Sequence, residues 1–115
     1  MTPLATVTDL HVHLRWHTWR PAACLDAAAV RDLVIAIDDA GARCGVTVLR
    51  GACLRGRVDL LVSFEPTTRL SDFVGFVKSL SCWHANRRAG GALRWSPGFE
   101  ARSVATEELE SVPFN

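Results

Sequence analysis

The 115-residue sequence contains no tyrosine, only one lysine and no cysteine pair with the spacing Cys-x-x-Cys. Without tyrosine, no phenol is available as a nucleophile anywhere in the chain. No stretch approaches the roughly 18 apolar residues of a membrane-spanning helix. No apolar run follows basic residues near the N-terminus, as it would in a secretory signal. From these absences we predict that the protein is neither inserted into a membrane nor exported. They favour a cytoplasmic protein.

The composition is that of an ordinary globular protein. Hydrophobic residues make up 49% and charged residues 22%, which predicts one folded domain over residues 1–115. The net charge is +1, so no strong overall field attracts nucleic acid. The spacing of the four cysteines matches no zinc ligand set, and we expect reduced, buried thiols. They are Cys24, Cys44, Cys53 and Cys82.

Residues 6–17 alternate between apolar and polar side chains, which indicates a half-buried strand. One face carries four apolar side chains: Leu10, Val12, Leu14 and Trp16. The other face carries four basic side chains: His11, His13, Arg15 and His17. Pro21 and the alanine pair after it are expected to end this strand.

Helical spacing follows, from Asp26 as N-cap to Gly41 as the end. The residues expected to face inward are Val30, Leu33, Val34 and Ile37. Residues 45–54 and 57–64 read as two strands of a hairpin, with a tight turn at Arg55–Gly56.

A second helix is predicted over residues 68–88. Its inward residues are expected to be Leu70, Phe73, Val74, Val77 and Leu80. Residues 88–92 read as a loop, residues 102–104 as a short strand, and residue 106 as the start of a last, short helix.

The predicted order β-α-β-β-α-β favours an α+β, ferredoxin-like fold, with a four-stranded antiparallel sheet and two helices on one face. In that fold the first and third strands are neighbours at the centre of the sheet. The face away from the helices then carries the basic side chains of the first strand beside Arg57 and Asp59.

Three segments resemble one known family over nearly the whole chain. They read LHVHLRWHTWRP, GRVDLLVSFEPTTRLSDFVGFVKSLSCWHANR and LRWSPGFEARSVATEELESV. In this order and spacing, they are similar to the single-tyrosine HUH transposases of the insertion-sequence 200/605 type, and most of all to the REP-associated tyrosine transposases.

The resemblance implies DNA transposition by single-strand cleavage and rejoining. In active relatives, two histidines and a downstream glutamine hold a Mg²⁺ or Mn²⁺ ion, and a tyrosine attacks the DNA phosphate. The implied partner is DNA, single-stranded or in a hairpin. Family members often form dimers, so a sheet-edge homodimer is an open alternative here.

The sequence departs from the family where this chemistry sits. Arg57 and Asp59 occupy the positions of the two metal-ligand histidines. Asp59 could ligate a hard cation, but a guanidinium has no lone pair to donate. A charge of +1 at about 4 Å from a divalent ion costs on the order of 8 kcal/mol at an effective dielectric of about 20. We therefore expect Arg57 and Asp59 to neutralise each other.

The nucleophile is missing as well, because the family's tyrosine would fall at or beyond Asn115. Most of the family's nucleophile helix is absent with it. We predict a transposase-like domain that is catalytically inactive by the family mechanism and holds no metal cofactor.

The alternative is a small metal-binding domain or metal-dependent enzyme. His11 and His13 point the same way on the first strand, and Asp59 from the neighbouring strand could be a third ligand. Against this, arginines crowd the same face. Their charge favours the alternative that these histidines are polar residues that face water or DNA.

Basic groups interleaved with aromatic rings suit a nucleic-acid backbone with stacked bases. The DNA-binding candidates are His13, Arg15, His17, Trp19, Arg20, Lys78, Arg87 and Arg88. The structural alternatives are that Trp19 plugs the strand–helix turn, that Lys78 lies on a solvated helix face, and that Arg87 and Arg88 complement the helix dipole. Three further arginines read as ordinary surface: Arg43, Arg50 and Arg55.

Overall fold

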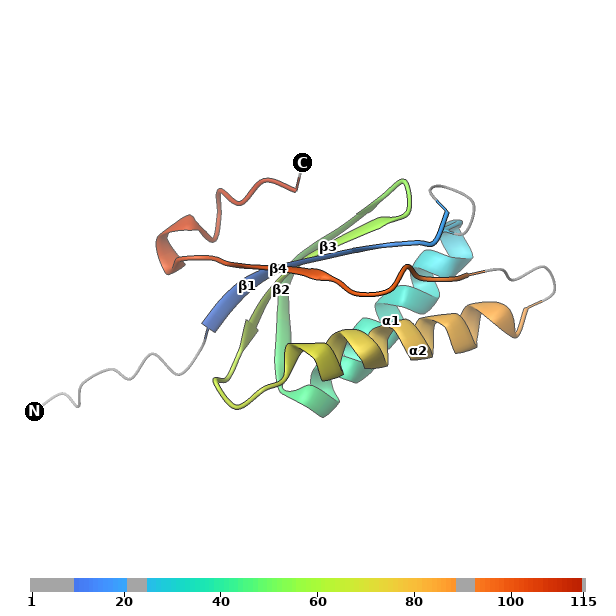
Figure 1. Ribbon diagram of the computed structural model, residues 1–115, viewed down its shortest axis with the longest axis horizontal. Coiled ribbons are helices and arrows are strands. Elements are labelled where there is room, and N and C mark those ends of the chain that lie inside the picture. Colours follow the sequence, from blue (N-terminus) through green and yellow to red (C-terminus); the bar gives the residue numbers. More distant parts are fainter. Residues whose placement is uncertain (1–9, 21–24, 89–92, 115) are drawn as a thin grey trace, which may run out of the picture.

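Four antiparallel strands form one sheet in the computed structural model, which describes residues 10–20, 25–88 and 93–114. The strands are β1 (Leu10–His17), β2 (Val46–Leu54), β3 (Arg57–Phe64) and β4 (Glu100–Ser103). Their order across the sheet is β2-β3-β1-β4. Helices α1 (Ala27–Cys44) and α2 (Leu70–Asn86) cover one face (Figure 1). The chain thus has the ferredoxin-like α+β fold expected from the sequence.

The central strands β1 and β3 pair with Leu14 opposite Leu60 and Arg15 opposite Asp59. Because side chains alternate along a strand, this register puts the apolar set of both strands under the helices. Val12, Leu14 and Trp16 are buried there, as the alternation predicted. The expected strand start at residue 6 and the expected break at Pro21 lie outside the described residues.

The tight turn expected at Arg55–Gly56 joins β2 to β3. Arg55 has φ 51° and Gly56 has φ 78°, so both central residues adopt the left-handed region that a two-residue type I′ hairpin requires. Glycine removes the steric cost at the second of these positions. The hairpin strands match the predicted ranges to within one residue.

Helix α1 begins as predicted and ends later than predicted. The Asp26 side chain caps the start by accepting a hydrogen bond from the Ala29 N–H at 2.8 Å. Gly41 does not end the helix, which runs on to Cys44 and is capped by Gly45 at φ 70°. A Cβ on Gly41 would stand 2.7 Å from the Val46 carbonyl oxygen, so glycine is needed here for close packing rather than for a turn.

The inward face of α1 also differs from the expected stripe. Leu33 and Ile37 are buried, but Val34 is 51% exposed and Val30 is only partly buried. Small residues fill the interior instead: Ala29, Ala36, Ala40 and Gly41. Their size lets α1 pack closely against its neighbours, which rotates the buried face away from the larger side chains.

Helix α2 buries Phe73, Val74 and Val77 as predicted, while Leu70 and Leu80 are only partly covered. The completely buried Ser81 hydroxyl donates to the Val77 carbonyl at 2.6 Å and accepts from Trp95 Nε1 at 2.9 Å. Trp95 in turn meets Trp16 edge to face, with 6.2 Å between ring centroids. This contact joins α2, β1 and the segment before β4 in one core.

The last part of the chain is less helical than predicted. β4 covers residues 100–103 rather than 102–104, and the expected final helix is a single 3-10 turn at Thr106–Glu108. The segment then returns over the sheet face opposite the helices (Figure 1). In the described parts of the chain, no helix has both the length and the apolar character needed to cross a membrane.

Candidate functional site

A buried carboxylate lies at the centre of the open sheet face, the face away from the helices. Asp59 is only 1% exposed and accepts three hydrogen bonds from side chains. His13 Nε2 and Arg15 Nε both lie 2.7 Å from Oδ1, and Arg57 Nε lies 2.9 Å from Oδ2. We call these four residues the Asp59 cluster. The mutual neutralisation expected of Arg57 and Asp59 is present, with two further donors.

The electrostatics of the Asp59 cluster favour the ionised form of the carboxylate. Burial by itself would raise the pKa of Asp59, but hydrogen bonds from Arg15 and His13 and the charges of Arg15 and Arg57 outweigh it. The pKa of Asp59 is therefore lowered. Both carboxylate oxygens already accept donors, and the guanidinium groups of Arg15 and Arg57 disfavour a cation beside them.

The predicted metal ligands His11, His13 and Asp59 do not assemble as a set of three. The structure brings His13 and Asp59 together, whereas His11 lies two residues further along β1. Over the described ranges, no group of three or more His, Cys, Asp or Glu residues is arranged to hold a metal ion. Two of the three ligands expected from the sequence, His13 and Asp59, are therefore in contact.

The segment Ser111–Phe114, which we call the strap, covers part of the open sheet face. The Phe114 ring packs against His13 with 4.9 Å between centroids, and the Arg50 guanidinium lies 4.4 Å from the same ring. Arg57 Nη2 donates to the Phe114 carbonyl, and Arg50 Nη2 donates to the Val112 carbonyl. Arg50 is exposed, as expected, but the sequence analysis did not predict these two contacts.

A β-bulge explains why Arg50 was missed. Strict alternation along β2 would turn Arg50 to the helix side with Val46 and Val48. The register shifts between Val48 and Arg50, so that Arg50 stands opposite Leu61 on the open face. No feature of the sequence marks this extra residue.

A second group of exposed side chains gathers where β1 ends. The Thr18 N–H donates to the Gly56 carbonyl at 2.8 Å, and the Trp19 N–H donates to the Arg94 carbonyl at 2.8 Å. These bonds bring the end of β1, the β2–β3 turn and the segment before β4 to one place. We call this region the hairpin end, and it comprises His17, Trp19, Arg20, Arg55 and Arg94.

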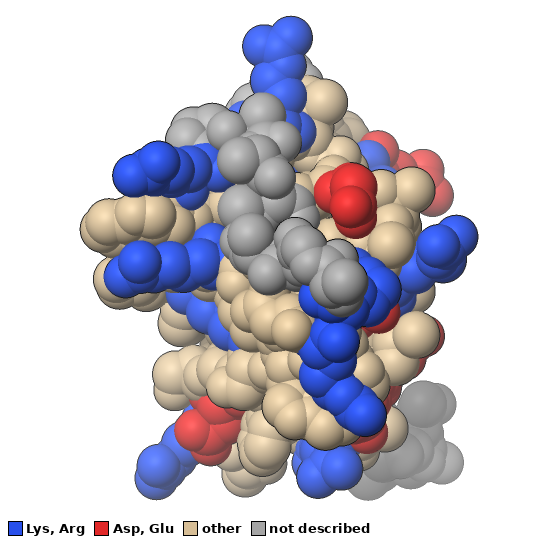
Figure 2. Space-filling view, turned by 90° about the vertical axis from the view of Figure 1, so that its right-hand side faces the viewer, with Lys and Arg blue, Asp and Glu red and all other residues tan. Residues whose placement is uncertain are grey.

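The hairpin end presents a half-exposed aromatic ring with a cation on it. Trp19 is 50% exposed, and the Arg94 guanidinium lies 4.7 Å from its ring centroid. His17, Arg20 and Arg55 are exposed as well. Figure 2 looks onto this end of the molecule and shows mostly basic side chains among the charged ones. The expected plug role of Trp19 does not fit an indole that is half in solvent.

A similar pair lies at the end of α2. The Arg87 guanidinium lies 4.3 Å from the Trp83 ring, and Trp83 is 55% exposed. Arg88, which the sequence placed with Arg87, instead hydrogen bonds to Asp32 of α1. Arg87 therefore presents its charge outward, whereas Arg88 ties the two helices together.

Lys78 is partly buried and bonds to backbone carbonyls of the same chain. Its ammonium group donates to the Ser96 carbonyl at 2.9 Å and to the Gly98 carbonyl at 2.5 Å. Burial lowers the pKa of Lys78. The lysine holds the segment before β4 against α2, and these contacts use two of its three ammonium donors.

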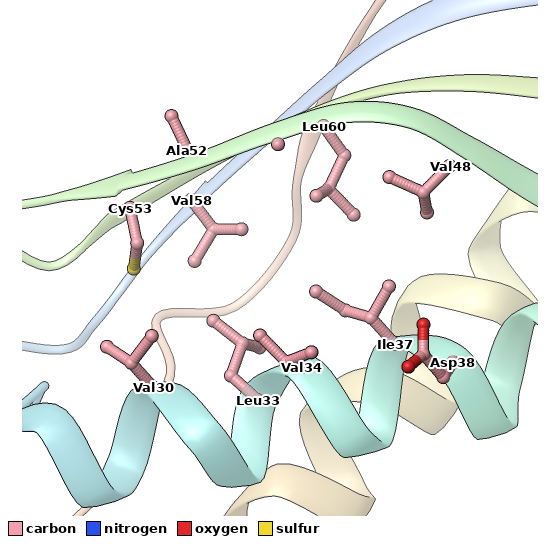
Figure 3. Close-up of a pocket in the computed structure, with 11 residues that line it drawn as sticks. Val30, Leu33, Val34, Ile37, Asp38, Val48, Ala52, Cys53, Val58 and Leu60 are labelled. Carbon is pink, nitrogen blue, oxygen red and sulfur yellow. The ribbon is translucent and has the colours of Figure 1, made fainter.

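An apolar hollow between α1 and the sheet lies away from all of these groups. About 330 Å³ of space separates α1 from β2 and β3, lined by apolar side chains such as Val34, Val48 and Leu60 (Figure 3). Cys53 lies on its wall, and burial together with the nearby Asp59 raises the pKa of that thiol. Cys44 and Cys53 are free thiols and only partly buried. Cys82 is partly buried and donates to the Leu93 carbonyl at 3.5 Å, and Cys24 lies outside the described residues.

Solved structures of other proteins share the fold of this chain. No family model matches the chain, and no curated protein matches its sequence. A provisionally assigned transposase from Deinococcus radiodurans superposes with a TM-score of 0.71 at 22% identity, covering 93% of this chain and 88% of that one. A REP-associated tyrosine transposase bound to a REP hairpin superposes with a TM-score of 0.73 at 14% identity, covering 96% and 67%. The chain has the transposase fold.

The transposase fold confirms the resemblance read from the three sequence segments, at the level of architecture. Of the DNA-binding candidates, the structure leaves His17, Trp19, Arg20 and Arg87 facing outward. It places four others in internal contacts: His13, Arg15, Lys78 and Arg88. The sequence analysis did not name Arg94 as a candidate. Only the backbone bond between Trp19 and Arg94 brings its guanidinium onto the Trp19 ring.

Proposed function

We propose that this chain is a DNA-binding domain with the transposase fold that does not cut DNA by the tyrosine mechanism of the family it resembles. The observation that carries the binding part is the exposed Trp19 ring under the Arg94 guanidinium at a basic end of the molecule. Stacked bases prefer such aromatic and guanidinium planes, and arginine also contacts phosphates. The solved transposase that is bound to a REP hairpin supports DNA as the partner.

The absence of cleavage rests on the chemistry of the described groups. The chain has no tyrosine, and Asp59 is held by three cationic or hydrogen-bonding side chains at 2.7–2.9 Å. An Arg57 guanidinium beside that carboxylate repels a divalent ion. We include in the proposal that residues 1–115 form one such domain.

The binding proposal is tested by fluorescence anisotropy with a labelled hairpin, a single strand and a duplex of equal length. We expect the hairpin or the single strand to bind more tightly than the duplex, because only unpaired bases can stack on Trp19. Trp19→Ala should weaken this binding about 10-fold, since stacking contributes roughly 1–3 kcal/mol per base.

A matched control is Phe76→Ala. Phe76 is 43% exposed on α2 and carries Arg43 at 6.0 Å, so it is another exposed aromatic–arginine pair, outside the hairpin end. Its loss should leave DNA affinity unchanged. Equal weakening by both substitutions, or no binding by the wild type, would rule the proposal out. A covalent protein–DNA product formed with Mn²⁺ would refute the inactive assignment.

A further inference from the structure

The hollow between α1 and the sheet exists because β2 turns a glycine toward the helix. After the bulge, Gly51 stands opposite Leu60 and Cys53 stands opposite Val58, so both face α1. A Cβ on Gly51 would stand 2.9 Å from Leu60 Cδ2, so the close approach of Leu60 requires glycine here. The register thus leaves β2 without a side chain at this point, and about 330 Å³ stays open.

The walls of the hollow are apolar and partly open to solvent. Leu33, Val34 and Ile37 point into it from α1, and Val48 and Leu60 close it from the sheet (Figure 3). Val34 is 51% exposed and Val48 is only partly buried, so solvent reaches this lining. The volume lies at the lower end of the range for small-molecule sites, roughly 300–1,000 Å³. An apolar group that enters the hollow removes these walls from water.

The two ends of the hollow differ in chemistry, as Figure 3 shows. The Cys53 thiol lies at the end near Val30, and the Asp38 carboxylate lies at the other end. Asp38 is exposed, and among the described residues that line the hollow it alone carries a charge. Val30 and Asp38 are about 12 Å apart along the axis of α1, from the rise per residue of a helix. The hollow is therefore an apolar channel with a negative charge at one end.

From this arrangement we infer that the hollow binds a small amphiphilic cation, an elongated apolar molecule with an ammonium group at one end. The apolar body lies between α1 and β2, and the ammonium group pairs with Asp38. A fatty acid would place its carboxylate beside Asp38, and the repulsion between the two charges disfavours it. This inference does not depend on the proposed DNA binding, because none of the described lining residues belongs to the hairpin end or to the Asp59 cluster.

The ligand class is tested by calorimetric titration with octylammonium, 1-octanol and octanoate at one neutral pH, below the concentrations at which they form micelles. Octylammonium should bind about 2- to 5-fold more tightly than 1-octanol, because an exposed ion pair contributes little. Octanoate should bind more weakly than either. Asp38→Asn should remove the preference for the cation. Asp39→Asn is the matched control, since Asp39 pairs with Arg43, does not line the hollow and should leave the preference unchanged.

The place of binding is tested by filling the hollow from α1. Val34→Phe puts a ring where the apolar body would lie, and it should abolish the binding of octylammonium. Ile35→Phe is the matched control, because Ile35 is 55% exposed and is not among the lining residues. Both positions are half in solvent, so both variants should unfold at the temperature of the wild type, which thermal denaturation checks.

A second readout of the place uses the thiol in the wall. Octylammonium at about ten times its Kd should slow the alkylation of Cys53 by N-ethylmaleimide about 10-fold, by mass action. Cys44, which is partly buried at the end of α1 and does not line the hollow, should react at the same rate with and without the ligand. Mass spectrometry of the digested protein measures both rates.

Each contrary result overturns a stated part of the inference. Equal affinity for octylammonium and octanoate would refute the ligand class. Binding that persists in Val34→Phe, or equal slowing at Cys53 and Cys44, would refute the site. No binding by any of the three amphiphiles refutes the whole inference, and if Val34→Phe then turns a dimeric wild type into a monomer in sedimentation, the occupant is a second copy of the chain. The anisotropy titrations with DNA remain a separate test of the proposed function.

Discussion

The Asp59 cluster and the hairpin end contain the same kinds of side chain in opposite states. In the cluster, the Nε groups of Arg15 and Arg57 bond to a carboxylate that is almost completely buried. At the hairpin end, Arg94 lies on a ring that is half in solvent. The difference shows that arginine beside an aromatic residue or a histidine has no fixed role, because burial and available partners decide whether its charge is used inside or outside.

The largest expected effect comes from removing the centre of the cluster. Asp59→Asn removes the buried carboxylate to which Arg15 and Arg57 both bond, and we expect the free energy of unfolding to fall by about 3 kcal/mol. Urea denaturation measures this change. Asp39→Asn is the control, since Asp39 pairs with Arg43 at the exposed surface and its loss should cost less than about 0.5 kcal/mol. Equal losses would mean that the cluster is no more stabilising than a surface pair.

The lowered pKa of Asp59 predicts a specific acid sensitivity. Because the folded-state pKa lies below the unfolded value of about 3.9, the stabilisation is present above that value and is lost as pH falls through the folded pKa. Below about pH 4, the wild type should therefore lose stability faster than Asp59→Asn. Urea midpoints measured from neutral to acid pH test this, and parallel curves for both proteins would contradict it.

A smaller effect is expected at Lys78. Lys78→Met removes the donors to the Ser96 and Gly98 carbonyls, and we expect a loss of about 1–2 kcal/mol in thermal or urea unfolding. DNA affinity should show the same salt dependence as in the wild type. Arg69→Met, at an exposed position before α2, should leave stability unchanged. A smaller slope of log affinity against log salt for Lys78→Met would show that this lysine contacts a DNA phosphate, as expected from the sequence.

The smallest effect on stability is expected at the hairpin end. Arg94→Gln should change the free energy of unfolding by less than about 0.5 kcal/mol, because its partner ring is half-exposed. The slope of log affinity against log salt should fall by about 1 if Arg94 contacts a phosphate. Anisotropy titrations at several salt concentrations measure this slope. A large loss of stability with an unchanged slope would make Arg94 a structural residue and remove the contrast between the two regions.

Much of the fold could be predicted from local patterns. The alternation in β1 and β3, the Arg55–Gly56 turn and the Asp26 cap are decided by residues close in sequence, and all are confirmed. The predicted end of α1 was wrong because Gly41 is needed for close packing against Val46. In the sequence alone, such a glycine cannot be told from one that ends a helix. The last helix was wrong because a short, acidic stretch at the edge of the fold gains little from packing and forms only one 3-10 turn.

The candidate site was predictable only in part. The sequence by itself placed His13, Arg15, Arg57 and Asp59 on one face, because strand periodicity fixes which side a residue takes. It also shows that residues 1–115 contain no tyrosine. The tertiary structure alone decided that Arg50 turns to the open face at a bulge, that Phe114 returns to cover it, and that Arg94 meets Trp19. Those contacts join residues far apart in the chain. Their geometry depends on strand register and on tertiary packing, which local sequence patterns do not predict.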